Sequence, residues 1–159
     1  MQKITPFLWF NNDAEEAVNF YVSIFKNSKI VNTSYYTTET PSNMPIGSVL
    51  TVVFEIEGQE FQALNGGPFF KFNESVSFVI NCDNQEEVDY YWNKLSSDPK
   101  AEQCGWLKDK FGVSWQIIPK QLAELISKDK SGKVMETMLN MKKIEISKLE
   151  KAYKEAENV

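Results

Sequence analysis

The hydrophobic and polar positions of this chain follow two periods, and the order of those periods occurs twice. Apolar residues at helical spacing run from Ala14 to Phe25 and again from Val88 to Leu95, which predicts two amphipathic helices. Runs rich in β-branched and aromatic residues, bounded by Gly, Pro and Asn, surround each helix and predict strands. The expected strands are 4–10, 29–37, 49–56, 59–64, 76–82, 104–108 and 113–118, with a shorter one around 101–103.

The repeated order of strand, helix and several strands recurs after roughly 70 residues, as a repeat of topology rather than of sequence. Each unit is too small to bury both faces of its sheet well alone. Pairing the two sheets would enclose a cleft, and ligand sites favour such junctions. The first helix is expected to begin at Asp13, with Glu16 completing a capping box.

The last predicted hairpin carries a polar residue on an apolar strand. Gly112 suits the turn because it adopts a positive φ without steric cost. Trp115 and Ile117 then share one face of the returning strand, and Pro119 ends it. Gln116 stands between them, where a pocket can use its amide.

Beyond Pro119 the pattern becomes helical, with segments at 121–126, 134–141 and 144–153. We therefore expect residues 120–159 to form a C-terminal helical extension that packs on the preceding domain or on a partner. The apolar positions expected to pack on the sheet are Leu122, Leu125, Val134, Met138 and Leu139.

Composition excludes several classes of function. The 159 residues, 42% hydrophobic and 25% charged, are typical of a globular protein with one domain or two small fused modules. The formal net charge of −5 argues against nucleic acid or an anionic membrane as partner. The first residues lead into a strand-like run rather than a signal peptide, no apolar run approaches the roughly 20 residues of a membrane span, and we expect a cytoplasmic location.

Histidine is absent from the chain, and the two cysteines lie far apart in sequence. The commonest general base and metal ligand is therefore missing, and Ser-His-Asp, Cys-His and histidine-containing zinc sites are excluded within one chain. Cys82 and Cys104 are expected to be free thiols in a reducing cytosol. A reactive Cys104 is the alternative, but no cation adjoins it in sequence to lower its pKa.

Several motifs together resemble one family. Residues 13–21, DAEEAVNFY, resemble the first-helix signature of the vicinal-oxygen-chelate superfamily, which contains glyoxalase I, extradiol dioxygenases and the bleomycin- and fosfomycin-resistance proteins. Residues 109–116, DKFGVSWQ, resemble its last hairpin. The segments ITPFLWF at 4–10, ALNGG at 63–67 and QCGW at 103–106 resemble the PhnB-like branch, whose members are often labelled 3-demethylubiquinone-9 3-methyltransferase.

The resemblance implies an α+β fold in which two paired βαβββ modules form a cleft-shaped half-barrel, often as a homodimer. The domain would span residues 1–119, with modules at about 3–67 and 75–119, followed by the helical extension at 120–159. The methyltransferase label has no physical support in the sequence, because no glycine-rich turn is followed by a helix and a downstream ribose-binding acid, the arrangement typical of sites for nucleotide-like cofactors.

The superfamily takes one metal ligand from each of four strands, and the resemblance places those positions at Thr5, Phe61 or Gln62, Ser77 and Gln116. None of them is a histidine or a carboxylate, and hydroxyl and amide oxygens are weak ligands for a divalent transition metal. The resemblance therefore implies that the metal site is lost, that no cofactor is held, and that glyoxalase or dioxygenase chemistry is absent.

The candidate ligand-binding residues combine a few polar groups with aromatic side chains, as in pockets for amphipathic or planar molecules. The alternative interpretation places the tryptophans in a core or an interface and the amides against backbone groups. Other readings are a metal-dependent lyase or dioxygenase using Glu55, Glu57 or Glu60, or a structural dimeric module without a ligand. The candidates are Thr5, Trp9, Gln62, Asn65, Ser77, Trp106, Trp115 and Gln116.

Overall fold

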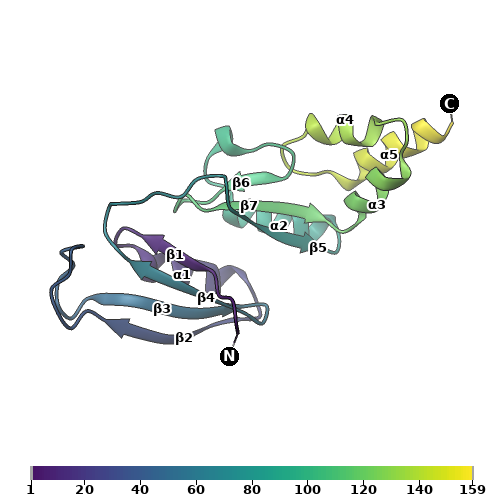
Figure 1. Ribbon diagram of the computed structural model, residues 1–159. Helices are drawn as coiled ribbons and strands as arrows, with labels where there is room; N and C mark the ends of the chain where they lie inside the picture. The colour runs from purple at the N-terminus through teal and green to yellow at the C-terminus, as the bar shows by residue number, and fades with distance from the viewer. Residues whose placement is uncertain (1, 159) are drawn as a thin grey trace. The chain divides into compact units, whose positions relative to one another are not determined.

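The computed structural model describes residues 2–158 and has the predicted α+β architecture (Figure 1). The chain divides into two compact units, unit 1 up to Phe72 and unit 2 from Asn73 onward. Each unit has its own sheet with one helix packed against it. Among the described residues, no helix combines the length and the apolar character that crossing a membrane demands.

Unit 1 is a βαβββ module. Its sheet has the strand order β1-β4-β3-β2, in which β1 lies parallel to β4 and the other neighbours are antiparallel. The hairpin between β3 and β4 turns at Glu57 and Gly58, both with positive φ, as the sequence predicts. The elements are β1 (Phe7–Phe10), α1 (Ala14–Ile24), β2 (Ser28–Tyr35), β3 (Val49–Ile56) and β4 (Gln59–Asn65).

Helix α1 covers one face of this sheet. The ring of Tyr21 stacks on Phe54, which stacks in turn on Phe61 with centroids 5.4 Å apart, and all three side chains are buried. Because side chains alternate along a strand, Gln62 and Leu64 occupy the opposite, helix-free face. The register at this strand is therefore resolved: Phe61 is a core residue, and Gln62 has the helix-free position opposite Phe7 and Val53.

Unit 2 repeats the plan with a smaller sheet, ordered β5-β7-β6. Strands β5 and β7 are parallel, and β6 returns antiparallel to β7. Helix α2 packs on all three strands, and its apolar residues Val88, Trp92 and Leu95 are buried, as are Leu107 and Ile117 on the sheet. The elements are β5 (Ser77–Cys82), α2 (Gln85–Leu95), β6 (Trp106–Lys108) and β7 (Ser114–Pro119).

Two local predictions are wrong. The short strand expected around 101–103 is a 3₁₀ turn, Pro99–Ala101, followed by a single bridge between Gln103 and Trp106. Pro99 has a fixed φ that favours the turn, and Asp98 accepts a hydrogen bond from the Lys100 N–H at 3.0 Å. Strand β6 accordingly starts at Trp106, after a two-residue turn.

The expected capping box at Asp13 also fails, because the Asp13 side chain makes no capping hydrogen bond to α1. Helix α2, by contrast, has a side-chain cap, because the Asn84 side chain accepts a hydrogen bond from the Glu87 N–H at 2.9 Å.

The C-terminal helices are α3 (Gln121–Lys128), α4 (Lys133–Leu139) and α5 (Ile146–Glu157), drawn in green to yellow in Figure 1. They enclose a small core of their own, against which Ile118 of β7 packs. Leu139 is exposed, so its predicted packing on the sheet is wrong. The buried members of the core are Leu122, Val134, Met141, Ile144, Leu149 and Ala152.

Hydrogen bonds to main-chain groups hold this helical segment to the rest of unit 2. The N–H groups of Cys104 and Gly105 donate to the carbonyls of Met141 and Lys142, at 2.7 and 2.8 Å. The Gln85 side chain accepts from the Ile146 N–H and donates to the Ile144 carbonyl, at 2.8 and 3.0 Å. These contacts join the segment after β7 to both α2 and the turn before β6.

Candidate ligand-binding site

Ser77 and Gln116, two positions matched to the superfamily's metal ligands, are in direct contact. The Gln116 amide Nε2 donates a hydrogen bond to Ser77 Oγ at 2.9 Å, between the neighbouring strands β5 and β7. Ser77 pairs with Ser114, two residues before Gln116, so these three side chains share one face of the sheet. Trp115 and Ile117 point to the opposite face, toward α2, and the polar face is therefore the helix-free one.

Two further side chains from β6 lie on this face. Trp106 pairs across the strands with Gln116, and Lys108 pairs with Ser114. The Lys108 ammonium forms an ion pair with Glu74, and its hydrogen bond holds the pKa of that exposed carboxyl below its usual value. Lys108 is a residue that the sequence interpretation missed, although alternation from Trp106 would have placed it beside Ser114.

Ser114 is buried, with 2% of its surface exposed, and its hydroxyl has no hydrogen-bond partner among residues 2–158. Buried hydroxyl groups normally have a partner, and one without a partner within the protein indicates a place for water or a ligand. The helix-free face of unit 2 thus combines Ser77, Lys108, Ser114 and Gln116 beside the Trp106 ring.

Trp115 does not lie on that face. Its side chain is buried, its ring contacts Phe78, and its indole N–H donates to Asp109 Oδ2 at 2.9 Å. The other oxygen of Asp109 accepts from the N–H groups of Phe111 and Val113, at 2.8 and 3.1 Å. Asp109 is therefore a buried carboxylate that organises the β6–β7 hairpin. Its position at the start of the turn is a sequence signal for this role, because Asp side chains commonly bond to backbone N–H groups of a turn.

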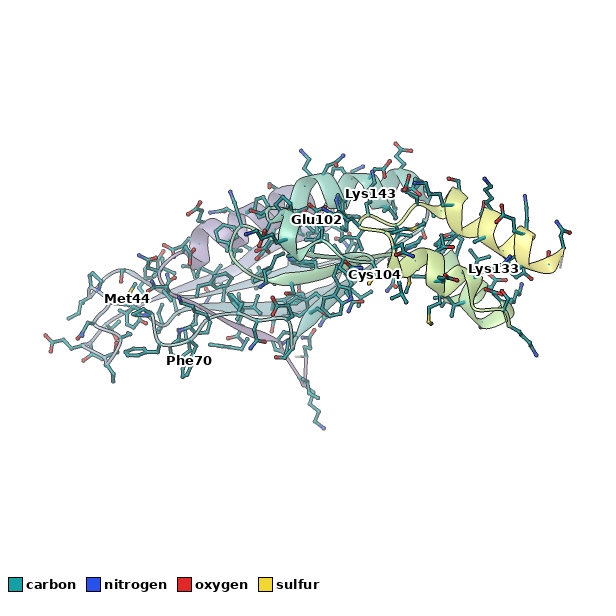
Figure 2. The ribbon with its side chains drawn as sticks, turned by 90° about the horizontal axis from the view of Figure 1, so that it is seen from above. Met44, Phe70, Glu102, Cys104, Lys133 and Lys143 are labelled. Atoms are coloured by element: carbon teal, nitrogen blue, oxygen red, sulfur yellow. The ribbon has the colours of Figure 1, made fainter. Side chains whose placement is uncertain are left out.

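In unit 1, Trp9 and Gln62 lie on the helix-free face, on the adjacent strands β1 and β4. The indole N–H of Trp9 donates to the Gly67 carbonyl at 3.0 Å, and a Cβ placed on Gly66 would overlap its ring carbons. Phe70 meets the indole edge to face with centroids 4.9 Å apart, and is itself exposed (Figure 2). The one hydrogen-bond donor of the Trp9 side chain is therefore engaged within the protein.

Asn65 is buried at the end of β4, and its amide serves the fold. Its Oδ1 accepts from the Ala14 N–H at 2.9 Å, which caps α1 in place of Asp13. Its Nδ2 donates to Glu15 at 2.6 Å and to the Val49 carbonyl at 3.1 Å. Three elements of unit 1 therefore meet at this one side chain.

The remaining candidates of unit 1 are less closely grouped. Thr5 precedes β1, and its hydroxyl lies 3.4 Å from the Gln2 amide. Glu55 pairs with Lys29 at 3.5 Å, whereas Glu57 is exposed in a turn. Within residues 2–158, no group of three or more Cys, Asp or Glu residues is arranged to hold a metal ion.

The donor chemistry at Ser77 and Gln116 does not fit a divalent metal. Both side chains are neutral, and hydroxyl and amide oxygens alone are weak ligands for a divalent transition metal. Neither side chain carries a negative charge that would offset a dication. We therefore derive no catalytic step through a metal at these positions.

Both cysteines are free. Burial raises the pKa of the Cys82 thiol to about 12, with Glu87 and Asp83 adding to the effect. Burial also raises the pKa of Cys104, which is half-buried in the turn before β6 (Figure 2). A raised pKa suppresses the thiolate, so neither thiol is activated as a nucleophile.

Comparison with known proteins gives a consistent family. Residues 2–118 match the family model described as 3-demethylubiquinone-9 3-methyltransferase. A Bacillus cereus structure described as a 3-demethylubiquinone-9 3-methyltransferase, PhnB protein, is 38% identical, with a TM-score of 0.62 over 74% of this chain and 99% of that one. No curated protein is similar to the chain at a significant level.

Two fosfomycin-resistance structures share the fold at low identity. FosX from Mesorhizobium loti is 16% identical, with a TM-score of 0.54 over 80% of this chain and all 100% of that chain. FosX from Listeria monocytogenes, in complex with Mn(II) and a sulfate ion, is 15% identical, with a TM-score of 0.51 over 80% and 98%. With the fold, the motifs and the family match in agreement, the chain belongs to the PhnB-like 3-demethylubiquinone-9 3-methyltransferase family.

Proposed function

We propose that this protein binds a small amphipathic or aromatic molecule without a metal ion, on the helix-free face of the sheet in unit 2. The observation that carries the proposal is the 2.9 Å hydrogen bond between Gln116 and Ser77. Two of the positions that the sequence resemblance matches to metal ligands therefore hold neutral side chains that are bonded to each other. The aromatic side chain of Trp106 lies on the helix-free face of unit 2 and supplies flat apolar surface to such a ligand.

The methyltransferase description of the family has no counterpart in the contacts of unit 1. Nucleotide-like cofactors are commonly held at a glycine turn whose backbone is open to the ligand. Here the turn after β4 is used internally, because Gly66 lies against the Trp9 indole and the Gly67 carbonyl accepts its N–H. Pro68 follows at once and no helix opens at this turn, since the next helix begins at Gln85.

Metal analysis of the purified protein tests the proposal first. We expect no stoichiometric metal by elemental analysis, and no change in Tm when zinc, nickel, manganese or iron(II) is added at micromolar concentration. The matched control is Gln116→Glu, which restores a carboxylate at the position where the superfamily has one. A stoichiometric metal in the wild-type protein, or its stabilisation by a metal, would overturn the metal-free proposal and favour an enzyme.

The ligand itself can be sought by thermal shift with a panel of planar and amphipathic molecules. Binding should quench or shift the fluorescence of the tryptophans, and Trp106→Leu should lower the affinity for the ligand. The same samples would report the oligomeric state by light scattering, where we expect the homodimer common in this fold. If no member of a broad panel stabilises the protein, a structural role without a ligand becomes the better reading.

A further inference from the structure

We infer that the helix-free face of unit 2 binds an anionic group of its ligand, a carboxylate or a phosphonate-type oxyanion. The inference rests on the proposed function, and it names the chemical class of ligand for that site. It arises from the four polar side chains at the centre of the face, which we call the donor cluster: Ser77, Lys108, Ser114 and Gln116.

The donor cluster has more hydrogen-bond donors than acceptors available for a ligand. Because Ser77 Oγ accepts from Gln116, the hydroxyl hydrogen of Ser77 is left to donate elsewhere. The second N–H of the Gln116 amide is also a donor, and Lys108 offers three. The acceptors are the Gln116 carbonyl oxygen and the exposed Glu74 carboxylate, which is paired with Lys108. A ligand rich in acceptors is the natural complement.

Ser114 gives an independent indication. Its hydroxyl is buried at the centre of the cluster, between Ser77 on one side and Lys108 on the other, and has no partner within residues 2–158. A buried hydroxyl without a hydrogen bond costs free energy, and a ligand oxygen would remove that cost. Ser77 and Ser114 are paired residues of adjacent strands, which lie about 5 Å apart, so two oxygens of one oxyanion can bridge their hydroxyl groups.

Lys108 supplies the charge. A hydrogen bond between an ammonium and an oxyanion is roughly twice as strong as a neutral one. In the free protein Glu74 pairs with this ammonium, and Glu74 is largely exposed, so a ligand oxyanion can displace it. The ammonium and the hydroxyl groups of the donor cluster would then receive the oxygens of the ligand. Trp106, beside Gln116, would contact the apolar part of the ligand.

The test uses three probes with the same aromatic ring: phenylphosphonate, benzoate and neutral benzamide, titrated into the full chain by calorimetry or tryptophan fluorescence. We expect one of the two anions to bind roughly tenfold or more tightly than benzamide, and Lys108→Gln to remove that preference. The anion that binds best distinguishes a phosphonate site from a carboxylate site. Lys120→Gln is the matched control, because Lys120 pairs with Asp83 away from the cluster.

A second variant gives a result of the opposite sign. Glu74→Gln removes the competing carboxylate at an exposed position and should tighten binding of the anion, whereas Ser114→Ala should weaken it. If benzamide binds as tightly as the anions, and Lys108→Gln and Glu74→Gln change nothing, the anion inference fails while ligand binding stands. If neither these probes nor the broad panel binds, the inference and the proposed function fail together.

Discussion

Asp109 accepts the indole N–H of Trp115 at 2.9 Å while its other oxygen accepts two backbone N–H groups of the intervening turn. The carboxylate is buried, so its charge is stabilised by these three donors rather than by water. The bond also sets the face of β7: with Trp115 held on the side of α2, Gln116 is directed to the helix-free side.

Replacing Asp109 should therefore destabilise unit 2 and disturb the donor cluster together. In Asp109→Asn an amide N–H₂ replaces one accepting oxygen and meets an N–H donor, which costs about 2–3 kcal/mol of unfolding free energy. Urea unfolding followed by tryptophan fluorescence measures the loss. Asp98→Asn, at an exposed turn, is the control and should cost less than about 1 kcal/mol. Equal effects of the two changes would contradict the role assigned to Asp109.

Asn65 is expected to act in folding through the start of α1. Asn65→Ala removes the cap on the Ala14 N–H and leaves the Val49 carbonyl without this donor, which should lower the unfolding free energy by about 2 kcal/mol or more. Asn65→Asp should also destabilise, because it places a second carboxylate beside Glu15. Asn19→Ala, on the exposed side of the same helix, should be neutral or slightly stabilising. A stable Asn65→Ala protein with impaired ligand binding would instead favour direct contact with a ligand.

Gly66 and Trp9 should be energetically coupled. Gly66 has no positive φ, so alanine is acceptable to its backbone, but its Cβ would overlap the indole. We expect Gly66→Ala to cost about 1–3 kcal/mol in the wild-type background and much less in Trp9→Leu. A double-mutant cycle by urea unfolding gives the coupling energy. A coupling near zero would show that the ring can move aside without loss.

Stability should fall at alkaline pH through Cys82. Its pKa is raised to about 12 in the folded protein, above the ordinary value of 9.0 that it regains on unfolding. Above pH 9 the unfolded chain releases this proton and the folded chain keeps it, so the unfolded state gains stability until pH passes about 12. Urea midpoints between pH 8 and 10 should decline more steeply in the wild-type protein than in Cys82→Ala. Parallel declines would assign the effect to other groups.

The local pattern of apolar and polar residues in the sequence determined the helices, the strands and the faces of each strand. The period of apolar residues gave α1, α2 and the strand Val49–Ile56, and the Glu57-Gly58 pair gave the hairpin turn, because each depends on residues near in sequence. The strand alternation that sets Trp115 and Ile117 on one face and Gln116 on the other was also readable. The sequence prediction that Trp115 and Gln116 line one site was inconsistent with this alternation, because neighbouring residues of a strand face opposite sides of the sheet.

Tertiary structure decided which distant side chains meet. Asn65 caps a helix that begins 51 residues earlier, and Ser77 bonds to Gln116 from 39 residues away. Whether Phe61 or Gln62 faces α1 depended on a strand register that a shift of one residue would invert. Such contacts are set by sheet register and by the packing of helices on one face. Periodicity within a segment therefore determines which residues share a face, but not which distant residues contact that face.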